Sequence, residues 1–244
     1  MQTNKVGGMD AETRILQPET AGPPPDPHMP GPSAVTGLLC LLVWIQIVVV
    51  FVFLEFALWA PTTHIRNRWS VVAMCALLVF VLTDRPSLNR LGLGLPTMVG
   101  AGLILGASLA AVALLLILVS VVGGQIPANP GWFPNLQSAG GYAVWALIQE
   151  FILQSFFFTR FEELYGSSAA VWIAATLFAA AHLPSPILTT GTLIGALFFC
   201  EMFRRYRSIY PLGIAHALLG LTIAITMPDI LLHHMRVGLG YLQH

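Results

Sequence analysis

Three ionisable side chains, Glu150, His182 and His216, lie inside long apolar stretches of this chain. An ionisable group near the middle of a bilayer is costly unless it is paired or hydrated, so such a residue is a functional-site hypothesis by default. Carboxylic acids and imidazoles are the side chains that most often transfer protons in catalysis. The three residues are therefore the first candidates for a functional site.

Each candidate has a companion four positions away. The pairs are Glu150 with Gln154, His182 with Phe178, and His216 with Gly220. Residues four apart lie on the same face of a helix, so the members of each pair point in one direction. Taking about 1.5 Å per residue, Glu150, His182 and His216 lie at depths in the membrane that differ by about 10 Å, which helix tilt can absorb. We therefore expect three helices to bring a carboxylate and two imidazoles to a shared polar pocket.

The elements that carry these residues are predicted to be membrane helices. The chain has 244 residues, of which 56% are hydrophobic and only 9% are charged, whereas soluble proteins carry about 25% charged residues. Its mean hydropathy is +0.77. This composition argues against a soluble enzyme, and a formal net charge of zero provides no basic surface for a nucleic acid. The lipid bilayer is the predicted partner of its surface.

Seven apolar segments predict an all-α, polytopic integral membrane helical bundle with about seven transmembrane helices. The segments cover residues 34–60, 70–84, 97–122, 139–160, 168–183, 187–203 and 209–231. Crossing the hydrocarbon layer takes about 20 residues, so 70–84 and 168–183 are short and must tilt, extend into their flanks or be sheltered by other helices. The apolar runs are continuous rather than alternating, which argues against membrane strands.

The chain divides into three predicted parts. Residues 1–33 contain the run PETAGPPPDPHMPGPS, whose prolines predict a disordered N-terminal tail. Residues 34–232 form the predicted transmembrane domain. Residues 233–244, which include His233, His234 and His244, are predicted to be a short solvated C-terminal tail.

Arginines predict that three connections share the cytoplasmic side, because Lys and Arg are enriched in cytoplasmic loops. These connections contain Arg85 and Arg90, Arg160, and the run RRYR at 204–207. Glu162 and Glu163 are assigned to the cytoplasmic loop that follows Arg160. Glu201 and Arg205 have the i, i+4 spacing of a helical ion pair. The three cysteines, which include Cys200, lie in apolar runs and are interpreted as small buried hydrophobic residues.

Three motifs in order resemble those of a known family of membrane proteases. The chain carries QEFILQ at 149–154, FAAAH at 178–182 and HALLG at 216–220. They resemble the EExxxR, FxxxH and HxxxN or HxxxD motifs of the CAAX-prenyl-protease and bacteriocin-processing (CPBP, abortive-infection type) intramembrane proteases. The resemblance covers most of the chain from about residue 85. It implies an endopeptidase of a bacterial inner membrane that acts on a prenylated or membrane-tethered peptide.

Three motif positions depart from the family pattern. Gln149 stands where the family has its first glutamate, which the resemblance implies would activate water, and an amide cannot accept that proton. Gln154 replaces the arginine that would pair with the glutamates. Gly220 replaces the polar residue that would help to bind an oxyanion beside His216. The retained motif residues are Glu150, Phe178, His182 and His216.

The departures leave two interpretations open. In the first, Glu150 acts as the base in place of Gln149, the two histidines polarise the carbonyl or stabilise the oxyanion, and proteolysis survives in altered form. Neighbouring residues of a helix point about 100° apart, however, which speaks against this exchange. In the second, the chain is a pseudoprotease or non-catalytic membrane subunit, whose glutamines and histidines form a hydrogen-bonded core and which binds a partner helix or a lipid.

Gln154, Phe178 and Gly220 are the expected lining of the pocket under either interpretation. A glutamate and two histidines are also an acceptable zinc set by ligand type. No HExxH or other short-range pair of ligands is present, and the resemblance implies hydrolysis by glutamate and histidine directly. Zinc is therefore disfavoured, and no cofactor is expected.

Overall fold

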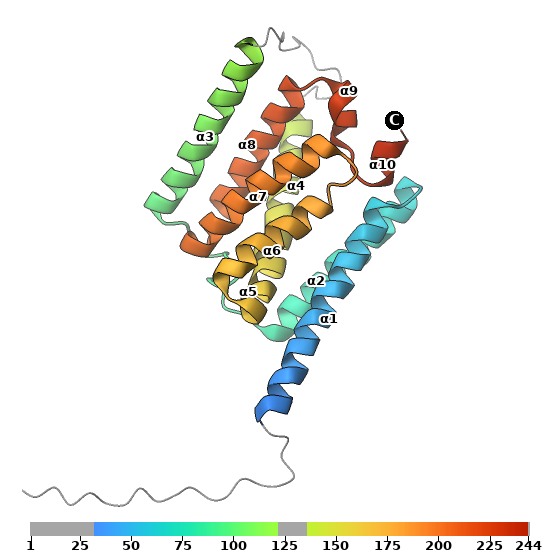
Figure 1. The fold of residues 1–244 in the computed structure, drawn as a ribbon, viewed down its shortest axis with the longest axis vertical. Coiled ribbons are helices and arrows are strands. Elements are labelled where there is room, and N and C mark those ends of the chain that lie inside the picture. The colour runs from blue at the N-terminus through green and yellow to red at the C-terminus, as the bar shows by residue number, and fades with distance from the viewer. Residues whose placement is uncertain (1–31, 122–135, 244) are drawn as a thin grey trace, which may run out of the picture. The chain divides into compact units, whose positions relative to one another are not determined.

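The computed structural model describes residues 32–121 and 136–243. All the regular elements in these residues are helices (Figure 1). The long elements are α1 (Pro32–Leu58), α2 (Thr63–Asp84), α3 (Met98–Val121), α4 (Leu136–Glu150), the π-helix η1 (Phe151–Phe158), α5 (Thr159–Tyr165), α6 (Ser167–Ala180), α7 (Pro186–Tyr206) and α8 (Tyr210–Thr226). Three short helices follow: α9 (Asp229–Leu232), η2 (His233–Met235) and α10 (Leu239–Leu242). Residues from Leu39 onward form one compact unit. The predicted tail at 1–33 lies almost entirely outside the described residues, as does His244.

Five helical stretches of the described chain are long and apolar enough to cross a membrane. They are Gly37–Leu58, Thr63–Asp84, Met98–Val121, Gln137–Tyr165 and Pro186–Tyr206, and the apolar helices Ser167–Ala180 and Tyr210–Thr226 are shorter. Large apolar side chains on the outer faces of these helices are exposed, as lipid contact requires. The predicted all-α membrane bundle is confirmed, and each of the seven apolar segments corresponds to one of these stretches.

Three predicted boundaries need correction. The segment 70–84 is not short, because α2 already begins at Thr63, where the Thr62 hydroxyl caps the helix by accepting from the Ile65 N–H at 3.3 Å. The segment 168–183 ends early, since α6 stops at Ala180. The segment 209–231 also ends early: α8 stops at Thr226, and Met227, which precedes a proline, is extended, as residues before proline commonly are.

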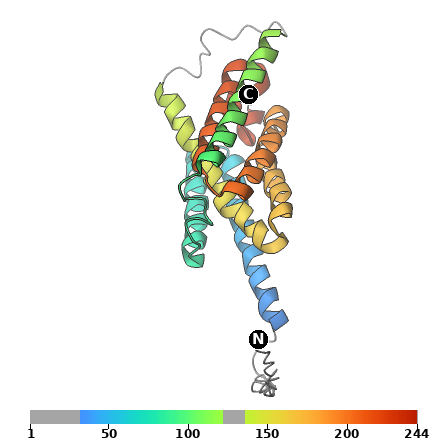
Figure 2. The same cartoon turned by 90° about the vertical axis from the view of Figure 1, so that its left-hand side faces the viewer.

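The central rod of the compact unit is made of α4, η1 and α5, which follow one another without a break (Figure 2). α4 packs on α8, α5 and η1 pack on α6, and α6 packs on α7. The whole of η1 after its first residue is buried. A π-helix of this length is unusual, because π-turns occur mostly singly and often at functional sites.

Ion pairs join residues that are far apart in the sequence at one end of the bundle. Arg160 is 3% exposed and donates to Asp84, and its Nε donates to the Gln46 Oε1 at 2.7 Å. The same end holds the pairs Arg90 with Glu163 and Arg207 with Glu162. The three arginine-containing connections therefore share one end, as the charge pattern predicts.

Two charge assignments have different outcomes. Glu162 and Glu163 belong to the helix α5 rather than to a loop, because each pairs with an arginine from another connection and the turn comes only at Gly166, whose φ is +80°. The predicted Glu201–Arg205 pair is confirmed, with 2.5 Å between the Glu201 Oε1 and the Arg205 Nε. Arg204 joins the same carboxylate from position i+3.

Candidate active site

Glu150 lies at the junction of α4 and η1 and has no exposed surface. Its Oε1 accepts a hydrogen bond from the Nδ1 of His216, on α8, at 2.8 Å. Its Oε2 accepts from the Nε2 of Gln154, in η1, at 3.2 Å. A buried carboxylate needs such partners, because an unpaired charge in an apolar interior is very costly. Both oxygens are thus engaged within the chain.

The hydrogen bond to Glu150 fixes which nitrogen of His216 carries a proton. An ionised carboxylate can only accept, so the Nδ1 of His216 is the donor, and in the neutral imidazole the Nε2 then keeps a lone pair. The His216 side chain is 12% exposed, whereas Glu150 is fully enclosed. The imidazole is therefore the part of this pair that a substrate or water can reach.

His182 lies in the turn that follows α6, not inside a helix as its segment predicted. Its Nδ1 is 2.8 Å from the carbonyl oxygen of Phe178. Because a carbonyl oxygen accepts, this nitrogen also carries the proton, and the Nε2 of His182 is likewise left with a lone pair. The i, i+4 relationship of Phe178 and His182 is thus realised through the backbone of Phe178.

The Phe178 ring links the two histidines. Its centroid lies 4.8 Å from that of His182 and 6.1 Å from that of His216. Phe199, on α7, also stacks with His216, with 5.7 Å between the ring centroids and 24° between the ring planes. The structure therefore gathers Glu150, Gln154, Phe178, His182 and His216, although His182 makes no hydrogen bond with Glu150 or His216.

Gln149 remains outside this hydrogen-bonded cluster. Its side chain is half-buried and makes no hydrogen bond with the residues that the structure describes. It precedes Glu150 in a regular α-helix, so its side chain points about 100° away. The hydrogen-bonded core predicted from both glutamines therefore contains Gln154 but not Gln149.

Gly220 faces the side chain of Tyr142, on α4. A Cβ atom placed on Gly220 would lie 1.9 Å from the Tyr142 hydroxyl oxygen, far closer than any real contact. The buried thiol of Cys200 lies close enough to Gln154 and Glu150 to interact with both. Sequence reasoning missed Tyr142 and Cys200 as site neighbours, because neither has a motif or an unusual residue type for a membrane helix.

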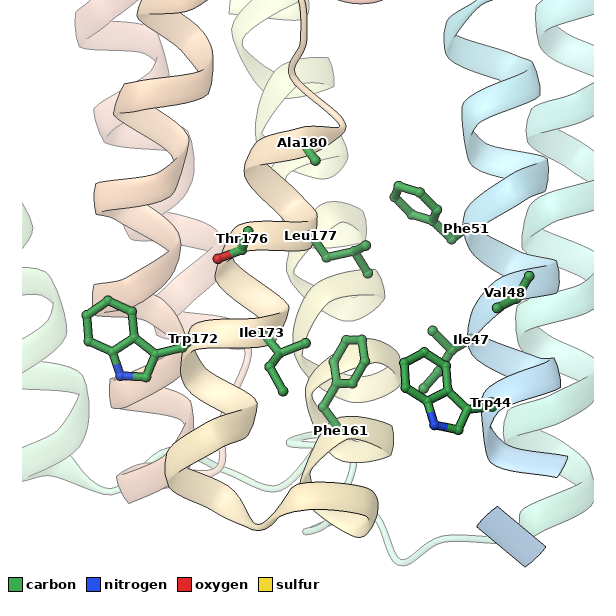
Figure 3. A pocket seen from close by; sticks show the side chains of 10 residues that line it. All are labelled: Trp44, Ile47, Val48, Phe51, Phe161, Trp172, Ile173, Thr176, Leu177 and Ala180. Atoms are coloured by element: carbon green, nitrogen blue, oxygen red, sulfur yellow. The ribbon is translucent and has the colours of Figure 1, made fainter. Parts of the chain in front are cut away.

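An apolar groove of about 540 Å³ runs between α1 and α6. In Figure 3, Trp44, Val48 and Phe51 approach it from α1, and Ile173 and Leu177 approach it from α6. The lining ends at Ala180, two residues before His182. The groove does not include Glu150 or His216, so it is a lateral neighbour of the candidate site.

Metal ligation was a disfavoured alternative for the same residues. Among residues 32–121 and 136–243, no group of three His, Cys, Asp or Glu side chains is placed to hold a metal ion. The described arrangement offers one carboxylate hydrogen-bonded to one imidazole, and a second imidazole hydrogen-bonded to a backbone carbonyl.

Comparison with known proteins agrees with the motif pattern. The family model described as Rce1-like, type II CAAX prenyl endopeptidase Rce1-like, matches residues 131–222. This range includes all three motifs and all the residues of the hydrogen-bonded cluster. Neither the comparison with curated proteins nor that with solved structures gives a match. The family match over residues 131–222 confirms the resemblance to the CPBP group that the three motifs indicate.

Proposed function

We propose that the chain is an intramembrane endopeptidase that cleaves a prenylated or otherwise membrane-tethered peptide in a bacterial inner membrane. The observation that carries the proposal is the 2.8 Å hydrogen bond between Glu150 and His216, within the segment that matches a family of prenyl endopeptidases. A buried carboxylate that orients one nitrogen of an imidazole leaves the other available as a general base.

The chemistry follows from the two imidazoles. The Nε2 of His216 accepts a proton from water as the water oxygen forms a bond to the peptide carbonyl carbon, and the carbonyl electron pair moves to its oxygen. When that pair returns, the carbon–nitrogen bond breaks and His216 gives its proton to the leaving amine. Glu150 stabilises the intervening imidazolium, as a buried carboxylate does beside a catalytic histidine. His182, with its own Nε2 lone pair, accepts a hydrogen bond from the same water.

In this scheme Glu150 acts through His216 rather than on water. Its carboxylate is fully buried and bonded on both oxygens, so the imidazole is the better-placed base. The scheme also explains how hydrolysis can proceed with Gln149 in the first motif position, because no step requires proton transfer to residue 149.

The groove between α1 and α6 supports a substrate with a lipid chain. Its lining is almost entirely hydrocarbon and includes the indoles of Trp44 and Trp172. Apolar concave surfaces hold alkyl and isoprenoid groups by removing them from contact with water. A chain in this groove ends near Ala180, so the peptide attached to it lies close to His182.

Purified protein in lipid nanodiscs tests the proposal with a farnesylated peptide and the same peptide without the lipid. We expect cleavage of the farnesylated peptide, followed by mass spectrometry, and a decrease of about 10²–10⁴-fold in His216→Ala. The matched control is His64→Ala, because His64 is exposed on α2 and outside the site. A wild-type protein that cleaves neither peptide would refute the proposal.

The enclosure of Glu150 favours a second candidate, a non-catalytic membrane subunit that holds a partner helix or a lipid. Its 0% exposure leaves no surface of the carboxylate for a water molecule. This alternative predicts that the farnesylated peptide binds without being cleaved, or that a membrane partner co-purifies in stoichiometric amount. Measuring retention of the farnesylated peptide by the nanodiscs beside its cleavage separates the two candidates, because only the second predicts binding without cleavage.

A further inference from the structure

Two aromatic rings bound one end of the groove between α1 and α6. Trp44, on α1, and Phe161, on α5, both line the groove, and their rings meet edge to face with 6.2 Å between the centroids. The Trp44 ring meets that of Tyr165 in the same way. Figure 3 shows Trp44 and Phe161 at one end of the groove and Ala180 at the other. A chain that enters beside Ala180 therefore meets these two rings last.

The opposite end of the groove is bounded by a residue of the C-terminal segment. The Gly238 N–H donates to the Leu183 carbonyl at 2.8 Å, and an added Cβ at Gly238 would lie 2.3 Å from the Leu58 carbonyl oxygen. Leu58 ends α1, and Leu183 directly follows His182 in the turn after α6. Gly238 thus lies between the two walls at the end where the candidate site begins, and the groove has a limited length.

The length of the groove corresponds to an isoprenoid chain of three five-carbon units. Trp172 lines the groove at the level of Trp44 in Figure 3. Helix α6 advances about 1.5 Å per residue, so Ala180 lies about 12 Å from the level of Trp172, and His182 comes two residues later. Each isoprenoid unit adds four backbone bonds of about 1.5 Å in a zigzag, or about 5 Å. A farnesyl chain with its head at His182 therefore ends at Trp44, and a geranylgeranyl chain is one unit too long.

The lining selects hydrocarbon, and its bounded end selects the length of the chain. None of the described residues that line the groove is charged. An extended sixteen-carbon acyl chain is about 20 Å long, so a bilayer lipid exceeds the groove as a geranylgeranyl chain does. Phe161 is buried in the core at 2% exposure, whereas Trp44 is 40% exposed. Trp44 is therefore the ring whose removal lengthens the groove without opening the core.

We propose that Trp44 sets the length of the lipid chain that the site accepts, so that a farnesylated peptide is preferred to a geranylgeranylated one. The inference rests on the proposed endopeptidase function and adds a specificity-determining residue to it. Trp44 lies outside residues 131–222, which match the family model. The limit on chain length is thus supplied by a part of the chain that the family match does not cover.

The first test removes the indole. Peptides of one sequence that carry a farnesyl or a geranylgeranyl group are compared by kcat/KM in nanodiscs. We expect the wild type to favour the farnesyl peptide by about tenfold or more, and Trp44→Ala to bring the ratio close to one by accepting the longer chain. Trp69→Ala is the matched control, because its indole packs on α1 against Phe53 and Phe56, outside the groove. Equal use of both peptides by the wild type, or an unchanged ratio in folded Trp44→Ala, overturns the inference.

The second test shortens the groove and does not depend on the folding of Trp44→Ala. Ile173 lines the groove from α6, and Ile173→Phe places a larger ring in the part of the groove that the third unit fills. We expect kcat/KM to fall about tenfold for the farnesyl peptide and to stay unchanged for a geranyl peptide of two units. A variant that loses activity equally on both peptides, or on neither, contradicts a length limit at this end.

A label on the lipid chain tests its position without turnover. A farnesylated peptide with a diazirine on its last unit is irradiated with the wild-type protein, and the labelled residues are identified by mass spectrometry. We expect the label on Trp44 and Phe161, whereas a label spread over the outer faces of α2 and α3 overturns the inference. Absence of cleavage in the wild type refutes the proposed function, whatever the position of the label. Cleavage with no dependence on chain length refutes the role of Trp44 alone.

Discussion

The Oε1 of Glu150 and the Nδ1 of His216 are 2.8 Å apart, although 66 residues separate them in the chain. Glu150 ends α4 and His216 lies within α8, so their hydrogen bond joins two helices that pack on each other. Charge-assisted hydrogen bonds of this kind are stronger than neutral ones. Substitutions at this pair are therefore the first test of whether the hydrogen bond serves catalysis or only stability.

Glu150→Gln keeps the size of the side chain and removes its charge. We expect kcat to fall by about 10²–10⁴-fold, because a neutral amide cannot stabilise the imidazolium of His216. Circular dichroism should show an unchanged helix content. Glu201→Gln is the matched control, since Glu201 pairs with Arg204 and Arg205 away from the site. Equal activity in Glu150→Gln and the wild type would show that Glu150 has no part in turnover.

Restoring two family residues should raise activity. In Gln149→Glu/Gln154→Arg, the new guanidinium lies next to Glu150, which Gln154 now contacts at 3.2 Å. It adds one positive charge where Gln149→Glu adds one negative charge, so the net charge of this part of the interior is unchanged. We expect the double variant to exceed the wild type in kcat, and Gln149→Glu alone to unfold at a lower temperature. A double variant with no gain in turnover counts against a latent catalytic site.

Removing the buried arginine should destabilise the bundle. Arg160→Leu leaves Asp84 without its partner and removes one of the two arginines that pair with Glu163. Because Asp84 is 39% exposed, we expect a loss below the about 3–5 kcal/mol in the free energy of unfolding that follows when a fully buried pair loses one member. The melting temperature of Arg160→Lys should lie between those of the wild type and Arg160→Leu, because an ammonium group has fewer donors in a less suitable geometry. Arg204→Leu is the control and should change thermal unfolding little, since surface pairs contribute little. Similar melting temperatures for Arg160→Leu and Arg204→Leu would contradict a structural role for Arg160.

A side chain at Gly238 should release the C-terminal segment, which folds back onto the bundle although it was predicted to be solvated. The Gly238 N–H donates to the Leu183 carbonyl at 2.8 Å, its φ is +57°, and an added Cβ would lie 2.3 Å from the Leu58 carbonyl oxygen. Limited proteolysis should therefore cut Gly238→Ala near its C-terminus faster than the wild type. Gly240→Ala should be unaffected, because its Cβ would meet nothing closer than 3.7 Å.

Hydropathy predicted most of the fold because a membrane helix must satisfy all its backbone groups internally and be apolar outside. It failed where a helix begins with polar residues. The first turns of α2 contain His64, Arg66, Asn67 and Arg68, which extend a helix beyond its apolar part. The end of α6 was also missed, since Ala181 and Leu183 continue the apolar run beyond Ala180, the last residue of the α-helix.

The candidate site was partly visible in the sequence for a similar reason. Glu150, His182 and His216 stand out because ionisable residues in apolar runs are rare. Tyr142 does not stand out, since an aromatic residue in a membrane helix is ordinary, and its relation to Gly220 depends on how α4 packs against α8. The absence of Gln149 from the cluster likewise depends on the rotation of α4 relative to α8, which spacing alone does not determine.

The π-helix η1 lies between two buried residues that hold the α4–η1–α5 stretch to other helices. Glu150 comes directly before η1, and Arg160 comes two residues after its end. The i→i+5 bonds of η1 wind more slowly than those of an α-helix, so η1 sets the angular phase between the carboxylate that meets α8 and the guanidinium that meets α1 and α2. Deleting one residue between Phe151 and Phe158 would rotate Glu150 relative to Arg160 about the helix axis. One of the two side chains would then point away from its partner. An insertion in the connection at 59–62, between α1 and α2, would not change this phase, so we expect the eight-residue stretch to tolerate a change in length less well than that connection.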